Sequence, residues 1–343
     1  MLTRSMQKNN LQSNEKLQSP TLTKVRIFVF SLGGPTTVLP DDLKKHSSSE
    51  ATAHERNNIS NVFRSYLILH FSQAFFVPSL KPSANNPKDR FNSDPAKWWN
   101  NFYKNNTANF FKNRKWLQQE FPVLSKVTQA DAGPITLLEV GAGAGNTAFP
   151  ILANNHNPNL KIHACDFSKK AVDVIRENEA YDTKNIQADV WDAASEVLPP
   201  GLEEGSVDVV LMIFIFSALS PSQWKQTVHN IHRLLKPGGE VLFRDYGRGD
   251  LAQVRFKKGR YLEENFYIRG DGTRVYFFEK DELIKIWTRN DVEGSDDPPS
   301  STGFEVVDLG VDRRLLVNRA KQLKMYRCWM QGRFRKQEKP RPG

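Results

Sequence analysis

The stretch from residue 135 to residue 245 alternates short apolar runs with helical patterns, and this alternation limits the fold more than any other feature. The run at residues 207–216 is almost continuously apolar, as is typical of a central parallel strand covered on both faces. Strands that alternate with helices predict a doubly wound α/β sheet. The predicted strands cover residues 135–140, 161–165, 184–190, 207–216 and 240–245.

The pattern changes after residue 260. Two aromatic runs flank the turn Gly-Asp-Gly-Thr, which predicts a β-hairpin insertion over residues 266–278. A helix over residues 280–288 and two strands near 305–309 and 324–330 follow. These two strands would complete a seven-stranded sheet.

The rest of the chain divides around this core. We expect residues 1–91 to be a largely disordered or irregular extension, because much of this region is polar and shows no clear periodicity. Residues 92–130 form an aromatic and basic helical segment that continues through Gln-Gln-Glu-Phe-Pro-Val-Leu-Ser-Lys-Val. We assign residues 131–332 to the α/β domain and residues 333–343 to a basic tail.

Net charge and composition limit the classes of binding partner and the cell compartment that we expect. The 343 residues carry a formal net charge of +10, which favours an acidic partner, nucleic acid before membrane. No apolar run reaches the roughly 18–20 residues that span a bilayer. The two cysteines, Cys165 and Cys328, support neither a disulfide framework nor a zinc site. We therefore expect a cytoplasmic protein with no bound metal and no membrane partner.

A glycine-rich turn joins the first predicted strand to its helix. Gly141, Gly143 and Gly145 stand in the stretch Leu-Leu-Glu-Val-Gly-Ala-Gly-Ala-Gly-Asn. Such a turn lets the backbone approach a ligand at the carboxyl edge of a sheet. A dinucleotide fingerprint would place its third glycine at position 146, where this chain has Asn146. The loop alone is also compatible with a purely structural bend.

Acidic residues at the ends of the next two strands indicate which cofactor the glycine loop binds. Asp166 can accept hydrogen bonds from both ribose hydroxyls of an adenosine ligand, and Asp189 is followed by Val190 and Trp191, which suit an adenine ring. These intervals are the S-adenosylmethionine signature of class I methyltransferases, with NAD as the main competitor. We expect the cofactor to contact Trp99, Tyr103, Arg114, Glu139, Gly141, Gly143, Asn146, Asp166, Phe167, Ser168, Asp189, Val190 and Ile213.

The ends of the fourth and fifth strands indicate the substrate side. The fourth strand lacks the acidic or Asn-Pro-Pro-Tyr motif of many amino-methyltransferases of nucleic acids, so a ring nitrogen with its own lone pair becomes the favoured target. Arg244 and Asp245 are the catalytic candidates in Phe-Arg-Asp-Tyr-Gly, and Tyr246 is a substrate contact. Asp245 would balance the charge of a methylated ring; a structural Arg244–Asp245 ion pair is the alternative.

The hairpin supplies a second group of substrate candidates. Tyr267, Arg269 and Arg274 combine an aromatic ring with cations, a combination that suits the phosphates and stacked bases of single-stranded RNA. A solvated hairpin without a ligand is the alternative.

Six blocks of the sequence carry a family resemblance: DPAKWWNNFYKNNTANFFKNRKWLQQEFP, LLEVGAGAGNTAFPIL, HACDFSKKAV, SVDVVLMIFIFSAL, LKPGGEVLFRDYGRGD and ENFYIRGDGTRVYFF. On these blocks the chain resembles, over roughly residues 92–290, the tRNA N3-methylcytidine methyltransferases. Two positions depart from the family pattern: Ala142 replaces a cysteine in the glycine loop, and Asn113 replaces an acid before Arg114.

The resemblance implies a Rossmann-like class I fold and S-adenosylmethionine-dependent methylation of cytidine N3 at position 32 of a tRNA anticodon loop. The expected partners are threonine or serine tRNAs, with an aminoacyl-tRNA synthetase or other accessory protein as a possible addition. Residues 92–130 would then be a lid over the cofactor that presents Lys104, Lys112 and Lys115 to tRNA. Two other readings stay open: an RNA or cytoskeletal adaptor that keeps the fold, and a methyltransferase for a protein or small molecule.

Overall fold

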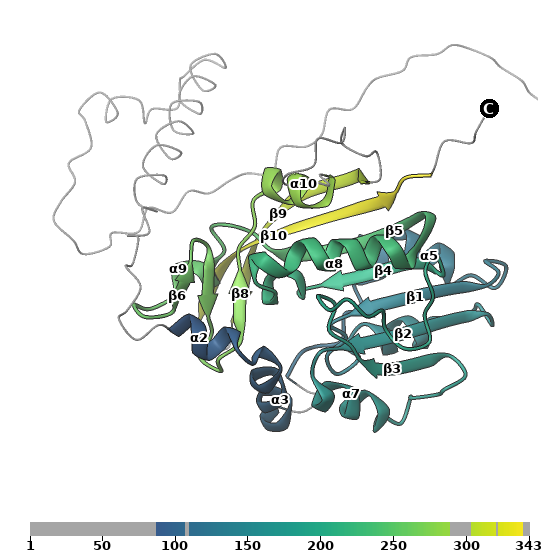
Figure 1. The fold of residues 1–343 in the computed structure, drawn as a ribbon, viewed down its shortest axis with the longest axis horizontal. Helices are drawn as coiled ribbons and strands as arrows, with labels where there is room; N and C mark the ends of the chain where they lie inside the picture. The colour runs from purple at the N-terminus through teal and green to yellow at the C-terminus, as the bar shows by residue number, and fades with distance from the viewer. Residues whose placement is uncertain (1–86, 107–109, 289–302, 320–321, 339–343) are drawn as a thin grey trace, which may run out of the picture. The chain divides into compact units, whose positions relative to one another are not determined.

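The computed structural model describes residues 87–106, 110–288, 303–319 and 322–338 (Figure 1). The extension predicted over residues 1–91 therefore lies almost entirely outside the described residues. The basic tail predicted over residues 333–343 is wrong at its start, because residues 333–336 continue the last strand of the central sheet, and residues 339–343 lie outside the described residues. Within the described residues, no helix is long and apolar enough to cross a membrane.

A seven-stranded sheet forms the centre of the domain, in the order β3-β2-β1-β4-β5-β10-β9 (Figure 1). The first five strands pair in parallel, whereas β10 is antiparallel to both of its neighbours. This is the doubly wound, class I methyltransferase arrangement that the sequence predicts. The strands are β1 Ile135–Val140, β2 Leu160–Asp166, β3 Ile186–Val190, β4 Val207–Ile213, β5 Leu235–Tyr246, β9 Phe304–Asn318 and β10 Leu323–Lys336.

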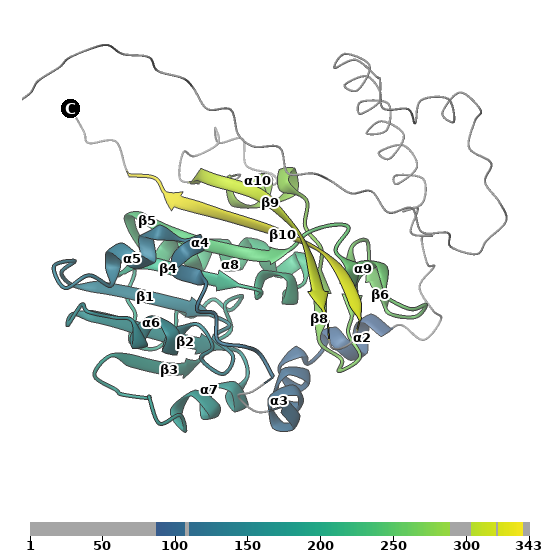
Figure 2. The same cartoon turned by 180° about the vertical axis from the view of Figure 1, so that it is seen from behind.

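Helices cover both faces of this sheet (Figures 1 and 2). Helices α8 (Pro221–Leu234) and α10 (Lys280–Thr288) bury Trp224, Ile231 and Trp287 against one face. The opposite face packs against helices with buried aliphatic and aromatic side chains, namely α4 (Leu117–Glu120), α5 (Pro122–Val127), α6 (Ala148–Ala153) and α7 (Lys169–Arg176).

The segment before the sheet is broken into short helices. Helix α2 (Pro87–Asn92) lies at the end of the extension that was expected to be largely disordered or irregular, and the aromatic stretch begins with α3 (Pro95–Asn106). The stretch 118–127, expected to continue the segment as one helix, is instead divided between two helices, α4 and α5, with Phe121 between them in a non-helical conformation. Pro122 explains the break, because proline has no N–H to continue a helix but suits the first position of a new one.

The insertion after β5 is larger than the predicted hairpin. The short helix α9 (Leu251–Val254) precedes a three-stranded antiparallel sheet of β6 (Tyr261–Glu263), β7 (Phe266–Ile268) and β8 (Arg274–Tyr276). The hairpin itself, β7 with β8, is confirmed.

The strand order fixes where a ligand can bind. Between β1 and β4 the order reverses, so the loops after these strands diverge to opposite faces and leave a crevice at their carboxyl ends. The glycine loop follows β1, and residues 214–218, with the short 3-10 helix η2 (Phe216–Ala218), follow β4.

Candidate active site

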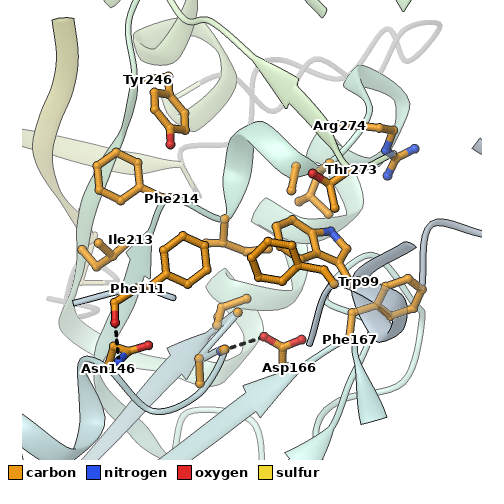
Figure 3. Close-up of a pocket in the computed structure, with 18 of the residues that line it drawn as sticks. Trp99, Phe111, Asn146, Asp166, Phe167, Ile213, Phe214, Tyr246, Thr273 and Arg274 are labelled. Carbon is orange, nitrogen blue, oxygen red and sulfur yellow. Dashed lines mark hydrogen bonds between the residues drawn. The ribbon is translucent and has the colours of Figure 1, made fainter. Parts of the chain in front are cut away.

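A cavity of about 620 Å³ lies at these carboxyl ends (Figure 3). Its walls come from the glycine loop, the aromatic segment 95–116, the ends of β4 and β5, the hairpin insertion and strand β10. The volume falls within the usual range for small-molecule and cofactor sites.

The glycine loop has a conformation that only glycine tolerates well. Gly141 has φ +68° and Gly143 has φ +60°. A Cβ on Gly143 would lie 2.5 Å from the Tyr103 hydroxyl, and one on Gly141 would lie 2.7 Å from Cγ1 of Ile215. The loop is therefore held between α3 and the turn after β4, with its backbone on the cavity wall.

Asp166 stands at the tip of β2 and lines the same wall (Figure 3). Its Oδ2 accepts from the Gly143 N–H and its Oδ1 from the Ser168 N–H, each at 2.8 Å. The side chain is almost wholly enclosed, and burial raises the pKa of this carboxyl to about 6. Ser168 is buried below it as the N-cap of α7, while Phe167 lines the cavity.

Glu139 and Arg114 support the loop from behind. Glu139 is buried, and this burial raises the pKa of its carboxyl to about 7. Arg114 lines the cavity, with Nη1 3.6 Å from Glu139 and 2.7 Å from Thr147 Oγ1. Asn113, which replaces the family's acid, accepts a 3.2 Å hydrogen bond from Asn146 Nδ2. Arg114 therefore has no acid beside it at position 113, and it pairs with Glu139.

The aromatic segment has both a core face and a cavity face. Phe102 and Tyr103 are buried, and burial raises the pKa of the Tyr103 hydroxyl far above its usual value. Trp99 stacks on Tyr103 at 6.2 Å and Phe111 on Phe102 at 5.6 Å, and both line the cavity (Figure 3). Hydrogen bonds from Asn146 to the Phe111 carbonyl and from Ser168 Oγ to Asn100 attach the segment to the loop and to α7.

The predicted adenine site is displaced by a few residues. Asp189 does not line the cavity; its carboxylate accepts from Arg176 at 3.0 Å and from Gln187 at 2.7 Å. Val190 is exposed and also lies outside. Trp191, which was predicted together with Val190, does line the cavity, and so does Asp192, because the chain turns toward the crevice only after β3 has ended.

The structure separates the two catalytic candidates, Arg244 and Asp245, and shows no ion pair between them. Successive side chains of a strand point to opposite faces, and here only Arg244 faces the cavity. Asp245 is fully buried behind it, where its two oxygens accept from the N–H groups of Ser217 at 2.9 Å and of Tyr246 at 2.8 Å. Burial raises the pKa of Asp245 to about 6.

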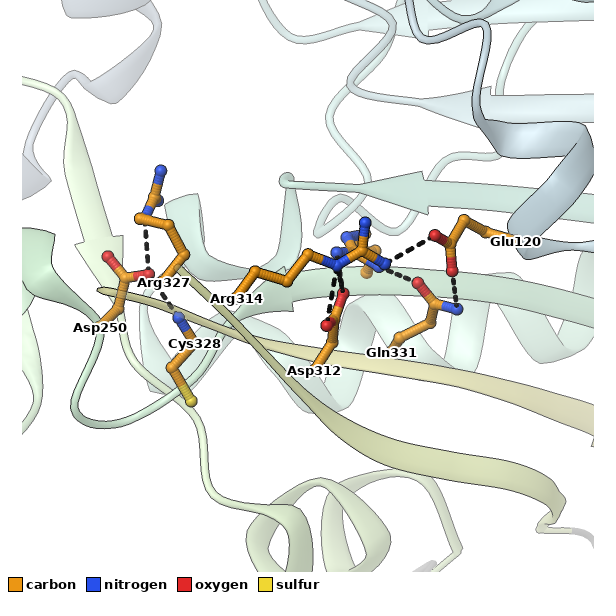
Figure 4. A network of polar contacts seen from close by, with 8 residues as sticks. Glu120, Asp250, Asp312, Arg314, Arg327, Cys328 and Gln331 are labelled. Carbon is orange, nitrogen blue, oxygen red and sulfur yellow. Dashed lines mark hydrogen bonds and ion pairs between the residues drawn. The ribbon is translucent and has the colours of Figure 1, made fainter. Parts of the chain in front are cut away.

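Arg244 belongs to a polar network at the junction of β5, β9 and β10; Figure 4 shows its members Asp312, Arg314 and Gln331. It is 2.5 Å from Asp312 and also bonds Gln331, and Arg314 connects Asp312 to Glu120. The guanidinium carbon lies 4.6 Å from the Trp329 ring centre and 5.1 Å from that of Trp116. The Arg244 guanidinium thus contacts the polar side chains of Asp312 and Gln331 and the aromatic rings of Trp116 and Trp329.

The hairpin brings its arginines, but not its tyrosine, to the cavity. Arg269 lines it with the guanidinium carbon 5.4 Å from the Tyr246 ring centre. Arg274 lines it too, bonded to Asn92 and Gln223, and burial lowers its pKa to about 10. Tyr267 lies in the hairpin's own small core, stacked on Phe256 at 4.8 Å, so it is not brought to the cavity.

The lysines of the aromatic segment are exposed, and Lys112 alone among Lys104, Lys112 and Lys115 lines the cavity. Ile213 lines it at the end of β4, as expected. Other lining residues carry no local signal in the sequence, because their positions depend on pairing between distant segments: Trp116, Phe214, Asp271, Arg314, Arg327 and Trp329.

Comparison with known proteins places this site in a family. A methyltransferase domain model matches residues 138–241. The chain is 54% identical over 249 residues to the tRNA(Thr) (cytosine(32)-N(3))-methyltransferase of Saccharomyces cerevisiae, which covers 72% of this chain and 38% of that protein. It is 51% identical to a tRNA N(3)-methylcytidine methyltransferase of Schizosaccharomyces pombe (73% and 77% covered), and 43% identical to one of Drosophila melanogaster (73% and 74% covered).

Proposed function

The chain belongs to the tRNA N(3)-methylcytidine methyltransferases, and from this premise we propose that it transfers the methyl group of S-adenosylmethionine to N3 of cytidine in tRNA. The observation that carries the proposal is one continuous cavity with two unlike walls. One wall is the glycine loop with Asp166; the other carries Arg244, Arg269 and aromatic rings.

The residues of the first wall fit the cofactor. Asp166 presents a carboxylate acceptor next to glycine backbone that carries no side chain of its own, which suits a ribose and the chain attached to it. Trp191 and Phe167 flank that position with aromatic surface for an adenine ring. When bound, S-adenosylmethionine supplies a methyl group on a sulfonium leaving group.

The residues of the second wall fit an unpaired nucleotide. Arginines and aromatic rings together bind phosphates and stack bases of single-stranded RNA. Cytidine N3 carries a lone pair and no proton, so the transfer forms an N–C bond and breaks a C–S bond without a general base. Alignment of the two reactants is then the main task of the protein.

The methylated ring is cationic, and its charge requires a nearby anion or aromatic surface. Asp245, which we expected to supply the anion, is buried away from the cavity. The carboxylates that line the wall within the described residues are Asp166, Asp192 and Asp271. We assign the charge-balancing role to Asp192 and Asp271, and to Asp245 a role in positioning the turn after β4.

The finer features of the proposal come from the relatives. We propose position 32 of the anticodon loop as the target and threonine or serine tRNAs as substrates. The printed name of the Saccharomyces cerevisiae relative supports position 32 and threonine tRNA. Residues 92–130 would act as a tRNA-contacting lid on the methyltransferase domain over 131–332. A cytoplasmic location and assistance by an aminoacyl-tRNA synthetase complete the proposal.

The proposal is tested by incubating the full chain with labelled S-adenosylmethionine and total tRNA, followed by nucleoside analysis. We expect 3-methylcytidine as the labelled product and no product from tRNA in which position 32 is uridine. Label in another nucleoside, or in protein, would contradict it. An adaptor that merely keeps the fold would bind tRNA and give no labelled nucleoside.

A further inference from the structure

The residue that follows β4 has an unusual backbone conformation. Within the described residues, the non-glycine positions with positive φ are Phe214 (60°), Asn265 (60°) and Gln322 (48°). Asn265 and Gln322 lie in the turns before β7 and β10, and asparagine tolerates this region better than most residues. A bulky phenylalanine there is a true outlier, and such strained residues cluster at ligand sites.

The surrounding structure fixes Phe214 in this conformation from several sides. Its N–H donates to the Arg244 carbonyl at 2.7 Å, continuing the pairing of β4 with β5. The next residue, Ile215, packs on Gly141 of the glycine loop. The N–H of Ser217, three residues after Phe214, donates to the Asp245 carboxylate. The neighbouring residues Arg244 and Asp245 therefore both hold the turn that carries Phe214.

The strained conformation directs the Phe214 ring to the cavity. Figure 3 shows the ring between Ile213 and Tyr246, at the junction of the cofactor wall and the cationic wall. Its centre lies 5.0 Å from that of Tyr246 and 6.3 Å from that of Trp329. The side chain is only half-buried, so the strain is not explained by a large gain in core packing.

Neighbouring aromatic rings already have cationic partners. Trp329 has Arg244 at 4.6 Å and Arg327 at 5.0 Å from its ring centre, and Tyr246 has Arg269 at 5.4 Å and Arg327 at 5.8 Å. Among the described residues, no Lys or Arg is found over the ring of Phe214. Among the rings of Phe214, Tyr246 and Trp329, that of Phe214 is therefore the one that a ligand can use without displacing an arginine.

We propose that Phe214 is the residue on which the target pyrimidine base stacks, and that the strained turn exists to hold its ring beside the glycine loop. This inference rests on the proposed function, since it names the contact that the methylated base makes. Stacking does not require a particular base, so Phe214 would orient the ring for in-line attack and leave recognition of cytosine to polar neighbours.

Three variants separate the ring from the backbone. Phe214→Tyr keeps the ring, Phe214→Leu keeps the bulk and the strain without an aromatic face, and Phe214→Gly removes both side chain and strain. Gln322→Gly is the matched control for relief of strain outside the cavity. For each we would measure kcat/KM with tRNA, the affinity for S-adenosylhomocysteine and the melting temperature.

We expect Phe214→Leu and Phe214→Gly to lower kcat/KM by about 10- to 100-fold, the usual value of one base–aromatic stack. Phe214→Tyr and Gln322→Gly should stay within about threefold of the parent, and cofactor affinity should change less than about twofold in all variants. Parent-like activity of Phe214→Leu would overturn the inference. So would a loss of activity matched by a loss of cofactor affinity or of folded protein.

A second readout keeps this test independent of methylation. An anticodon stem-loop RNA with pyrrolocytosine at the target position loses fluorescence when its base stacks on a protein ring. We expect quenching by the parent and by Phe214→Tyr, and at least a fivefold smaller quench for Phe214→Leu at saturating protein, where both bind the RNA. Quenching without any 3-methylcytidine from the parent would reject the proposed function and retain the stacking residue; equal quenching by Phe214→Leu would reject the stacking residue alone.

Discussion

The two walls of the cavity are built in different ways. The cofactor wall comes mainly from one stretch of chain, residues 139–168, and its contacts use backbone groups: the Gly143 and Ser168 N–H groups bond Asp166 directly. The substrate wall is assembled from segments far apart in the sequence. Gln331 bonds Glu120 across 211 positions, and Arg244 bonds Asp312 across 68 (Figure 4).

The two walls are therefore sensitive to different kinds of substitution. A backbone wall tolerates changes in many side chains and fails when a Cβ is added, because nothing nearby can move aside cheaply. A side-chain wall fails when one ionic partner is removed, because the remaining charge stays enclosed.

The largest effect should come from adding a Cβ to the loop. In Gly143→Ala the new carbon would lie 2.5 Å from the Tyr103 hydroxyl, so we expect cofactor affinity to fall about 100-fold. Gly205→Ala is the matched control: Gly205 has a similar φ of +66° and no atom within 4 Å of its added Cβ. Calorimetry with S-adenosylhomocysteine would decide. Parent-like affinity in Gly143→Ala, equal to that of Gly205→Ala, would mean that the close approach to Tyr103 does not govern cofactor binding.

The next effect concerns pH. The ionised Asp166 carboxylate accepts hydrogen bonds, so cofactor affinity should be constant above pH 7 and decline as the pH falls through its pKa of about 6, by about tenfold per unit at most. Asp166→Asn should bind weakly at every pH and lose this decline. Glu139→Gln is the necessary companion, because the Glu139 carboxyl behind the loop has a pKa of about 7. A decline that disappears in Glu139→Gln would assign the titration to Glu139.

A smaller effect is expected on the substrate wall. Asp312→Asn removes the anion beside Arg244, whose side chain is 3% exposed, and should lower the free energy of unfolding by about 2 kcal/mol and kcat by about fivefold. Cofactor affinity should not change. Glu204→Gln breaks the Arg233–Glu204 pair at the surface, where Glu204 is 62% exposed, and should cost less than about 0.5 kcal/mol. Chemical denaturation and steady-state kinetics measure both; a drop in cofactor affinity in Asp312→Asn would show that the walls are coupled.

The smallest effect should come from the exposed cation at the cavity. Lys112→Ala is expected to weaken tRNA binding about threefold at low salt and to reduce the slope of log affinity against log salt by about one. Lys126→Ala on α5, also exposed but outside the cavity lining, is the control and should leave the slope unchanged. Filter binding over a salt series gives both numbers. A slope unchanged in Lys112→Ala would remove Lys112 from the RNA-contacting surface.

Local patterns in the sequence predicted the fold well. The bounds of β1 agree at both ends, and the order of strands and helices, the hairpin and the closing strands all follow from apolar periodicity and turn residues. These features depend on neighbours a few positions away, so they are visible without the tertiary structure. The break between α4 and α5 at Pro122 had the same kind of local signal, although the chain was expected to continue as one helix.

The family resemblance and the glycine loop likewise came from contiguous residues. Gly141, Gly143, Asn146 and Asp166 all line the cavity, because the loop and the tip of the next parallel strand must meet at one sheet edge. Asp189 was predicted to contact the cofactor, but it lies outside the cavity. The strand tip was identified, but the direction of the chain beyond it, which brings Asp192 to the cavity, is not encoded in strand spacing.

By itself, then, the sequence determined the sheet, the cofactor loop and the family, because each is written in residues close along the chain. The tertiary structure alone decided the partners of Arg244, the removal of Asp245 from the cavity, and the use of Phe214 in a left-handed turn. The physical reason is that strand pleating and the pairing of β5 with β10, and of β10 with β9, determine which side chains face one another. Those pairings join residues that no local pattern connects.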